Sequence, residues 1–385
     1  MKGTPPDILD LVERFRLVEQ SDTNRRRQVL WHRWPREASG PPAFPITIEP
    51  EAPMWADILG FGLIRFYQDP EEYLRRNLQM ALYRFDRWGD DTPLEKRIRI
   101  WMGVNFEASL FGAETRYSDT ECPWITGGAL IDSEEDFDAL SRPDFQTSGL
   151  MPRAHEMYRR IREMLPDDFA VDFPDWERSP FGVCNHIRGT ENLLMDMVAE
   201  PRFAARQVEF MTACRKQWVA RRAEFLGIEL PPGVLLNDEV NGELFGPDLY
   251  EQFALPSEVA IGRFQGVTYW HSCGNATAFL PLIRRVPGLE IFHVGPRTDV
   301  DAAGREMTGL ALQVCMDPMQ DVQRADETHV RQRIGHIMEA CRGKAFTVRA
   351  DGLHTVDTLE RELKAIDQWL SAASAAREEF TQAGP

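Results

Sequence analysis

Hydrophobic and polar residues follow two alternating rhythms along most of this chain. Short apolar runs rich in β-branched and aromatic residues predict strands, and longer segments with apolar residues every three or four positions predict helices. Strands are predicted at residues 98–104, 169–173, 181–184, 234–236, 267–270, 289–292, 310–314 and 345–348. Helices are predicted at residues 5–18, 69–85, 134–140, 191–198, 202–226, 247–264, 276–286, 322–342 and 356–378.

Alternation of strands and helices predicts a parallel sheet with helices on its outside. Seven or eight strands favour a single closed (β/α)8 TIM barrel over an open doubly wound sheet, and no GxGxxG turn follows the first strand. We therefore expect an α/β fold with residues 45–385 as the barrel and residues 1–44 as an N-terminal helix and linker. In such a barrel the catalytic residues lie at the carboxyl ends of the strands.

The segment 24–45 differs in character from the rest. Five arginines are interspersed there with Trp31 and Trp34, and Gly40-Pro41-Pro42 closes the run. We interpret it as a solvated helix end followed by a linker. The alternative is a basic, aromatic arm that folds over an anionic ligand.

Nearly every late strand is followed by a residue that can titrate or bind a metal. These residues are His186 and Arg188, then Asn237, Asp238 and Glu239, then His271 and Cys273, His293, Cys315, and finally Arg349 and Asp351. Each alone is more often structural, as a helix cap or a packed side chain. Their convergence on one rim of the predicted barrel indicates a site.

The pair His271 and Cys273 follows the strand 267–270 directly. In a strand, residues i and i+2 point to the same side, so the imidazole and the thiol are directed to one place. Nitrogen and sulfur ligands together suit zinc. The structural alternative for an isolated pair is a buried cysteine beside a satisfied histidine.

Composition narrows the class of protein. The chain has 385 residues, 43% of them apolar, and a net charge of −17, which disfavours a broad nucleic-acid surface because phosphates would be repelled. The N-terminus has no apolar signal core, no apolar run approaches the roughly 20 residues of a membrane span, and the six cysteines show no paired spacing. We expect a cytoplasmic protein with reduced thiols.

Several segments resemble the uroporphyrinogen decarboxylase superfamily, over roughly residues 45–375 and most specifically between 178 and 320. They are Ser179-Pro180-Phe181, Arg188 to Met195, Asn237-Asp238-Glu239, Phe245 to Tyr250, His271 to Asn275 and Met316-Asp317-Pro318. The resemblance implies a single (β/α)8 barrel. It also divides by chemistry, because decarboxylases of this superfamily need no metal and carry an N-terminal arginine motif that the Arg25–Arg36 segment does not reproduce.

The other branch contains zinc-dependent methyltransferases that exchange a methyl group between a corrinoid and a thiol or small substrate. Its zinc ligands are matched by His271 and Cys273, whereas Asp351 stands where the branch places a distal cysteine. The resemblance implies His271, Cys273 and Asp351 as ligands, with His293 or Cys315 as alternates, and a corrinoid protein as partner because the chain has no corrinoid box. Asp238 or Glu239 is expected to be the acid or base.

Residues expected to contact the small-molecule substrate are Arg188, Asn237, His186 and Arg297. Two further functions stay open from the sequence. One is a metal-free decarboxylase of uroporphyrinogen or a related polycarboxylate, which would gather positive charge in the barrel mouth. The other is a barrel that binds a tetrapyrrole or corrinoid without turning it over, since fold alone does not determine activity.

Overall fold

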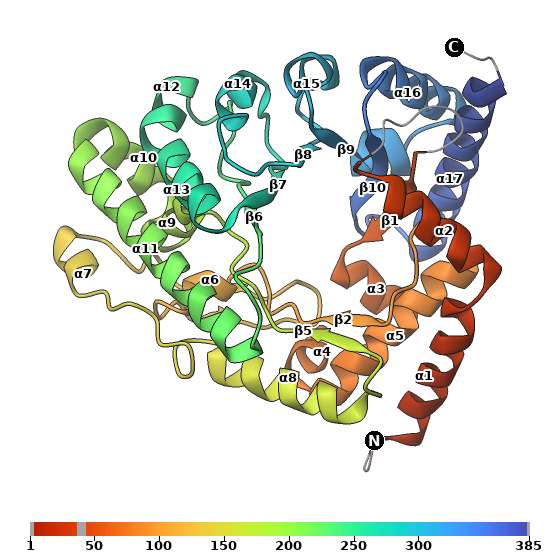
Figure 1. Cartoon of the computed structure of the whole chain (residues 1–385), viewed down its shortest axis with the longest axis horizontal. Coiled ribbons are helices and arrows are strands. Elements are labelled where there is room, and N and C mark those ends of the chain that lie inside the picture. The colour runs from red at the N-terminus through yellow and green to blue at the C-terminus, as the bar shows by residue number, and fades with distance from the viewer. Residues whose placement is uncertain (1–3, 37–43, 383–385) are drawn as a thin grey trace.

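The computed structural model describes residues 4–36 and 44–382 as ten strands surrounded by helices (Figure 1). The strands are β1 (Ile46–Pro50), β2 (Arg97–Arg99), β3 (Thr115–Arg116), β4 (Trp124–Ile125), β5 (Ala170–Asp172), β6 (Gly233–Leu236), β7 (Val267–His271), β8 (Ile291–Val294), β9 (Ala311–Met316) and β10 (Phe346–Leu353). The first nine helices are α1 (Pro6–Glu19), α2 (Asp22–Arg33), α3 (Ala52–Leu59), α4 (Leu63–Gln68), α5 (Pro70–Arg87), α6 (Phe106–Ser109), α7 (Glu134–Asp138), α8 (Met151–Met164) and α9 (Pro180–Arg188). They are followed by α10 (Thr190–Ala199), α11 (Pro201–Leu226), α12 (Pro247–Leu249), α13 (Leu255–Gln265), α14 (Leu280–Ile283), α15 (Val300–Glu306), α16 (Glu327–Ala340) and α17 (Leu359–Gln382).

Six parallel strands form one curled sheet in the order β1-β10-β9-β8-β7-β6, so the first strand pairs with the last. The parallel pair β2–β5 continues this arc, because a parallel bridge joins Arg178, just after β5, to Leu236 of β6. Eight parallel strands thus follow one another in chain order around a ring, with helices outside (Figure 1). The predicted (β/α)8-type barrel is confirmed.

The outer edge of β1 is satisfied by carboxylates. The backbone N–H of Ile46 donates to Asp91 (2.8 Å), and that of Ile48 donates to Asp90 (2.9 Å). The Asp90 side chain is fully buried and also accepts from Arg84 Nε at 3.0 Å. Buried N–H groups need partners, so these side chains take the place of ladder bonds beside β1.

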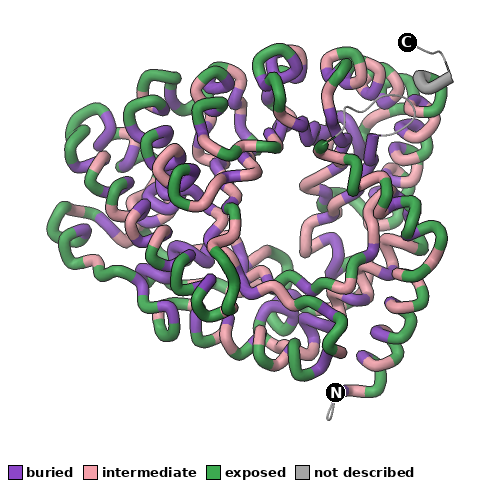
Figure 2. The backbone as a smooth tube through the Cα atoms, viewed as in Figure 1, coloured by how far each residue is buried: buried purple, intermediate pink, exposed green. Residues whose placement is uncertain are grey.

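Side chains of β7 alternate between the two sides of the barrel wall. Trp270 is fully buried, stacks on Phe292 of β8 at 5.5 Å, and donates its indole N–H to Glu258 of α13. Tyr269 and His271 therefore face the barrel interior, as strand geometry requires. Figure 2 shows β8, β9 and β10 as the most buried part of the strand arc, with exposed residues on the outer faces of the surrounding helices.

The predicted strand at 181–184 is wrong, because these residues belong to helix α9. Ser179 caps the helix by accepting from the backbone N–H of Gly182 (3.0 Å), and Pro180 occupies its first turn. Residues 180–185 are all buried. A helix buried on every side has no polar face, so its apolar run looks like a strand in the sequence.

Three other expectations need correction at the N-terminal side. Strand β1 was missed, although Ile46 and Ile48 alternate between two prolines. The predicted strand 98–104 shortens to β2, and the arginine-rich segment is helical as far as Arg33, as helix α2, with Arg27 buried rather than solvated. The Gly40-Pro41-Pro42 turn lies outside the described residues. None of the described helices combines the length and apolar character needed to cross a membrane.

Candidate metal centre at the carboxyl ends of the strands

The predicted rim residues do come together at the carboxyl ends of consecutive strands. Leu236 of β6 pairs with His271, Gln313 of β9 pairs with His293, and Cys315 pairs with Arg349. Residues two positions further along each strand lie on the same side of the wall. Six metal-capable side chains thereby form two groups, Asp238/His271/Cys273 and His293/Cys315/Asp351, and within each group the ligand atoms lie within 4.8 Å of one another.

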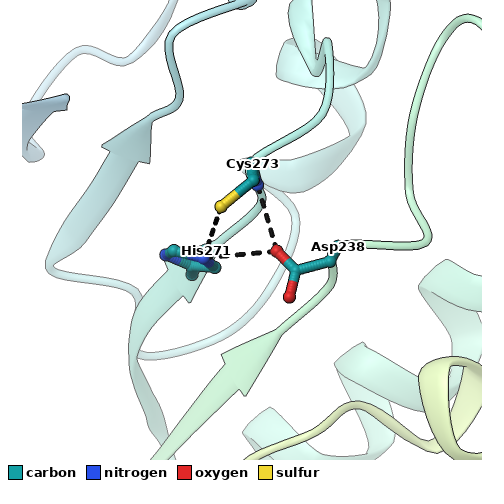
Figure 3. Close-up of side chains that lie close together, drawn as sticks. All are labelled: Asp238, His271 and Cys273. Carbon is teal, nitrogen blue, oxygen red and sulfur yellow. Dashed lines mark hydrogen bonds and ion pairs between the residues drawn. The ribbon is translucent and has the colours of Figure 1, made fainter. Parts of the chain in front are cut away.

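In the first group, called the outer group here, the side chains of Asp238, His271 and Cys273 point toward one another (Figure 3). His271 Nε2 lies 3.2 Å from Asp238 Oδ1 and 3.4 Å from Cys273 Sγ. The backbone N–H of Cys273 donates to the same Asp238 oxygen at 3.1 Å. The Asp238 side chain is 39% exposed and Cys273 is exposed, so an incoming molecule can reach these atoms.

The neighbours of His271 direct its bare nitrogen toward this group. Tyr269 donates its hydroxyl proton to Gln313 at 2.6 Å, so its oxygen is left to accept from His271 Nδ1, 3.4 Å away. In that tautomer Nε2 carries a lone pair, and it faces a carboxylate oxygen and a sulfur. Three electron-rich atoms this close repel one another unless a cation or a proton lies between them.

The pKa shifts of Asp238 and Cys273 also favour a bound cation in the outer group. Burial by itself raises the pKa of Asp238, but a proton held between His271 and Asp238, together with the charge of Arg178, brings that pKa below its usual range. Desolvation and the charges of Asp238 and Asp351 raise the pKa of the Cys273 thiol. The carboxylate is therefore ionised at neutral pH, whereas the thiol needs a bound cation to become a thiolate.

The outer group fits zinc in ligand type and spacing. With Zn–N and Zn–O bonds of about 2.0–2.1 Å and a Zn–S bond of about 2.3 Å, a tetrahedral ion separates N from O by about 3.3 Å and N from S by about 3.5 Å. The observed 3.2 Å and 3.4 Å agree with these edges. Three protein ligands with one open position are typical of catalytic rather than structural zinc.

The second group, called the inner group here, is buried beside the first. His293 and Cys315 are 1% and 2% exposed, and His293 Nε2 lies 2.8 Å from Cys315 Sγ. His293 Nδ1 donates to the carbonyl of Ser272 at 3.0 Å. The centroids of the His271 and His293 rings lie 3.9 Å apart, so the two groups lie directly beside each other.

Behind Asp238 lies a buried charge network that sequence reasoning did not find. Arg178 forms an ion pair with Glu239 and lies 3.8 Å from Asp238 Oδ2, and His186 Nε2 lies 3.1 Å from Glu239. Glu107, also buried, accepts the backbone N–H groups of residues 177 and 178. Glu239 and His186 were predicted as catalytic and substrate-binding residues. In the structure His186 contacts Glu239, Glu239 pairs with Arg178, and Arg178 lies beside Asp238. The single bridge at Arg178 is too short a strand to leave a pattern in the sequence.

Two other residues of the mouth were also missed, because β1 was missed. Glu49 lies 3.8 Å from Arg349 Nη2, and Arg349 Nε lies 3.3 Å from Asp351. Burial, helped by Asp351 and Glu49, raises the pKa of Glu51 to about 7. The alternation of Ile46 and Ile48 was the available signal for this strand.

Two of the other predicted substrate contacts, Arg188 and Arg297, already have carboxylate partners. Arg188 pairs with Asp196 at 2.8 Å and donates to the carbonyl of Ile131, and Arg297 pairs with Glu243 at 2.8 Å on the surface. Asn237 is fully buried. Both guanidinium groups therefore have carboxylate partners outside the two metal-capable groups.

One cavity is lined in part by a residue of the outer group, and a second, larger cavity is not. A small cavity of about 100 Å³ lies at the carboxyl ends of β2 and β5, and its lining includes Trp101, Glu107, Arg178 and Asp238. A larger one, of about 860 Å³, lies around the residues that precede β2 and is lined in part by helices α1, α2 and α5. Of the outer group, Asp238 contributes to the lining of the small cavity.

Comparison with known proteins agrees with this architecture. One solved structure, a methyltransferase from Methanosarcina mazei, superposes with a TM-score of 0.64 at 16% sequence identity, covering 91% of this chain and 98% of its own. No curated protein sequence matches. Residues 94–350, which carry seven of the eight barrel strands apart from the last residues of β10, match the family described as uroporphyrinogen decarboxylase (URO-D). With two thirds of its length matched and the barrel in place, this chain belongs to the URO-D family.

Proposed function

We propose that this protein is a zinc-dependent methyltransferase that moves a methyl group between a thiol or another small substrate and a corrinoid carried by a partner protein. The observation that carries the proposal is the outer group, whose nitrogen, oxygen and sulfur atoms have the spacing of a three-ligand zinc site. The likeness in fold to a protein named a methyltransferase supports it.

Each residue of the outer group has a defined part in this proposal. His271, Cys273 and Asp238 hold the metal, with Asp238 in the place first expected for Asp351. Zinc supplies one thing, which is to stabilise the thiolate form of a bound thiol at neutral pH. Tyr269 and Gln313 fix the ring of His271, and Arg178 with Glu239 holds the carboxylate of Asp238.

The methyl transfer needs no reactant besides the thiol and the methylated corrinoid. The thiolate sulfur bonds to the methyl carbon while the carbon–cobalt bond breaks, and the electron pair stays on the corrinoid. The thiol proton has to leave first, and the exposed edge of Asp238 gives it a route to solvent. In the opposite direction the same barrel would demethylate a small substrate and load the corrinoid.

The charge of the mouth argues against the decarboxylase alternative. Its arginines are already neutralised, Arg178 by Glu239, Arg349 by Asp351, and Arg99 by Glu177. A polycarboxylate would enter a mouth with little free positive charge and several carboxylates. Such a substrate would be repelled rather than held.

The test is methyl transfer from methylcobalamin to a panel of small thiols, followed by the corrinoid absorbance and by mass spectrometry of the thioether. We expect turnover that requires zinc, is lost in Cys273→Ser, and falls at least a hundredfold in Asp238→Asn. Cys341→Ser is the matched control, since Cys341 is buried beyond α16 and away from both groups. Zinc-independent decarboxylation of a polycarboxylate, with no methyl transfer, would contradict the proposal.

A further inference from the structure

The inner group has the features of a metal site in its own right. Its three ligands come from the ends of three adjacent strands, His293 from β8, Cys315 from β9 and Asp351 from β10. All three candidate ligand atoms lie within 4.8 Å of one another. Imidazole, thiolate and carboxylate together form a donor set that zinc accepts.

The tautomer of His293 is fixed by the backbone. A carbonyl oxygen can only accept, so the contact between Ser272 and Nδ1 places the proton on Nδ1 and leaves the lone pair on Nε2. Ligating histidines characteristically donate their second nitrogen to a carbonyl or carboxylate in this way. Nε2 faces Cys315 Sγ, 2.8 Å away, and a tetrahedral ion would need the two atoms to separate to about 3.5 Å.

The surroundings of Asp351 and the charge balance also suit a second ion. Arg349 lies 3.3 Å from Asp351 and 3.8 Å from Glu49, so an ion pair holds the Asp351 carboxylate in place. One thiolate and one carboxylate cancel a divalent ion in each group. With its thiol deprotonated, each filled group is therefore neutral, so a net charge on one group does not oppose binding of an ion at the other.

We infer that the inner group His293/Cys315/Asp351 binds its own zinc-type cation, next to the one at the outer group, so that this barrel carries a two-metal centre. The two sites are adjacent, because the rings of His271 and His293 lie 3.9 Å apart and His293 Nδ1 donates to the carbonyl of Ser272, the residue between His271 and Cys273 in the chain. The buried position of His293 and Cys315 makes the inner ion a supporting one, whereas the outer ion faces the substrate. The inner site stands on its own ligands and does not depend on the proposed methyl transfer.

The experiment is titration of chelator-stripped protein with Co²⁺ and Zn²⁺, with bound metal counted by mass spectrometry and sulfur-to-cobalt charge transfer followed by absorbance. We expect two equivalents in the parent and one each in Cys315→Ser and Cys273→Ser, with about half the charge-transfer intensity in each. The double variant should bind none, and Cys341→Ser should bind two. Circular dichroism checks folding, and Asp351→Asn, at a half-buried position, provides a second inner-site variant if Cys315→Ser does not fold.

The possible outcomes separate the two proposals. One equivalent in the parent, lost in Cys273→Ser and kept in Cys315→Ser and Asp351→Asn, would overturn the inner site and leave the outer site standing. One equivalent that depends only on Cys315 and Asp351 would support the inner site and remove the metal basis of the proposed function. No bound metal in any variant would overturn both.

Discussion

Removing Arg178 should destabilise this protein through the carboxylate that it neutralises. The Arg178 and Glu239 side chains are 6% and 9% exposed, and they form a direct ion pair. In Arg178→Met the apolar volume is largely kept, but Glu239 stays buried without its cation. His186, 3.1 Å from Glu239, remains as a single hydrogen-bond partner.

The expected cost follows from the burial of the pair. Breaking a buried ion pair by removing one partner costs about 3–5 kcal/mol, and the remaining His186 contact places this case near about 3 kcal/mol. For a chain of this length the unfolding entropy is on the order of 0.8 kcal/mol/K, so the melting temperature should fall by about 4 °C. The double variant Arg178→Met/Glu239→Gln removes both charges and should cost only about 1 kcal/mol.

Urea unfolding at pH 7.5, followed by tryptophan fluorescence and circular dichroism, measures these differences. The two single variants and the double variant form a cycle, in which the double variant should cost clearly less than the sum of the two single variants. Arg297→Met is the control, because its ion pair with Glu243 is 60% and 55% exposed and should contribute under about 1 kcal/mol. A loss in Arg178→Met no larger than in the control, or additive single effects, would refute the reasoning.

Three further predictions concern the wall of the barrel. Burial raises the pKa of Glu258 to about 7, above its unfolded value, so the stability it contributes is present at low pH and lost as pH rises toward 7. The free energy of unfolding of Glu258→Gln should therefore rise relative to the parent by up to about 3 kcal/mol between pH 4.5 and 8, measured by urea titrations. The same pH dependence in both proteins would contradict this. Asp90→Ala should cost about 3 kcal/mol in the same assay, since it leaves the backbone N–H of Ile48 and the guanidinium Nε of Arg84 without their acceptor. An unchanged free energy of unfolding would show that β1 needs no such partner. Gly304→Ala should lower the melting temperature, because a Cβ there would lie 2.1 Å from the carbonyl of Ala340, and overpacking costs about 1–3 kcal/mol; an unchanged melting temperature would mean that α15 and α16 can separate freely.

Much of the site could be predicted because period-two geometry is local. The alternation through Tyr269, Trp270 and His271 is a property of the strand itself, so His271 and Cys273 are directed to one side wherever the strand packs. The rule that barrel chemistry lies at carboxyl ends then brought in His293, Cys315 and Asp351.

The grouping of these residues could not be predicted, because it depends on register between strands. His271 pairs with Leu236 of β6, which places Asp238 beside it, whereas Asp351 extends from β10 and groups with His293 and Cys315. Register is set by the packing of the whole barrel rather than by any single strand. Helix α9 was mistaken for a strand for a related reason, since burial by neighbouring elements removed the polar face that marks a helix.

The central claim is that the outer group holds a metal with one position open to a substrate thiol. Its most direct test is the absorbance of Co²⁺-loaded protein as a small thiol is added. We expect a saturable increase in sulfur-to-cobalt charge transfer, present in the parent and in Cys341→Ser and absent in the Cys273→Ser variant. An unchanged spectrum in the fully loaded parent would show that no thiol enters the coordination sphere and would contradict the account.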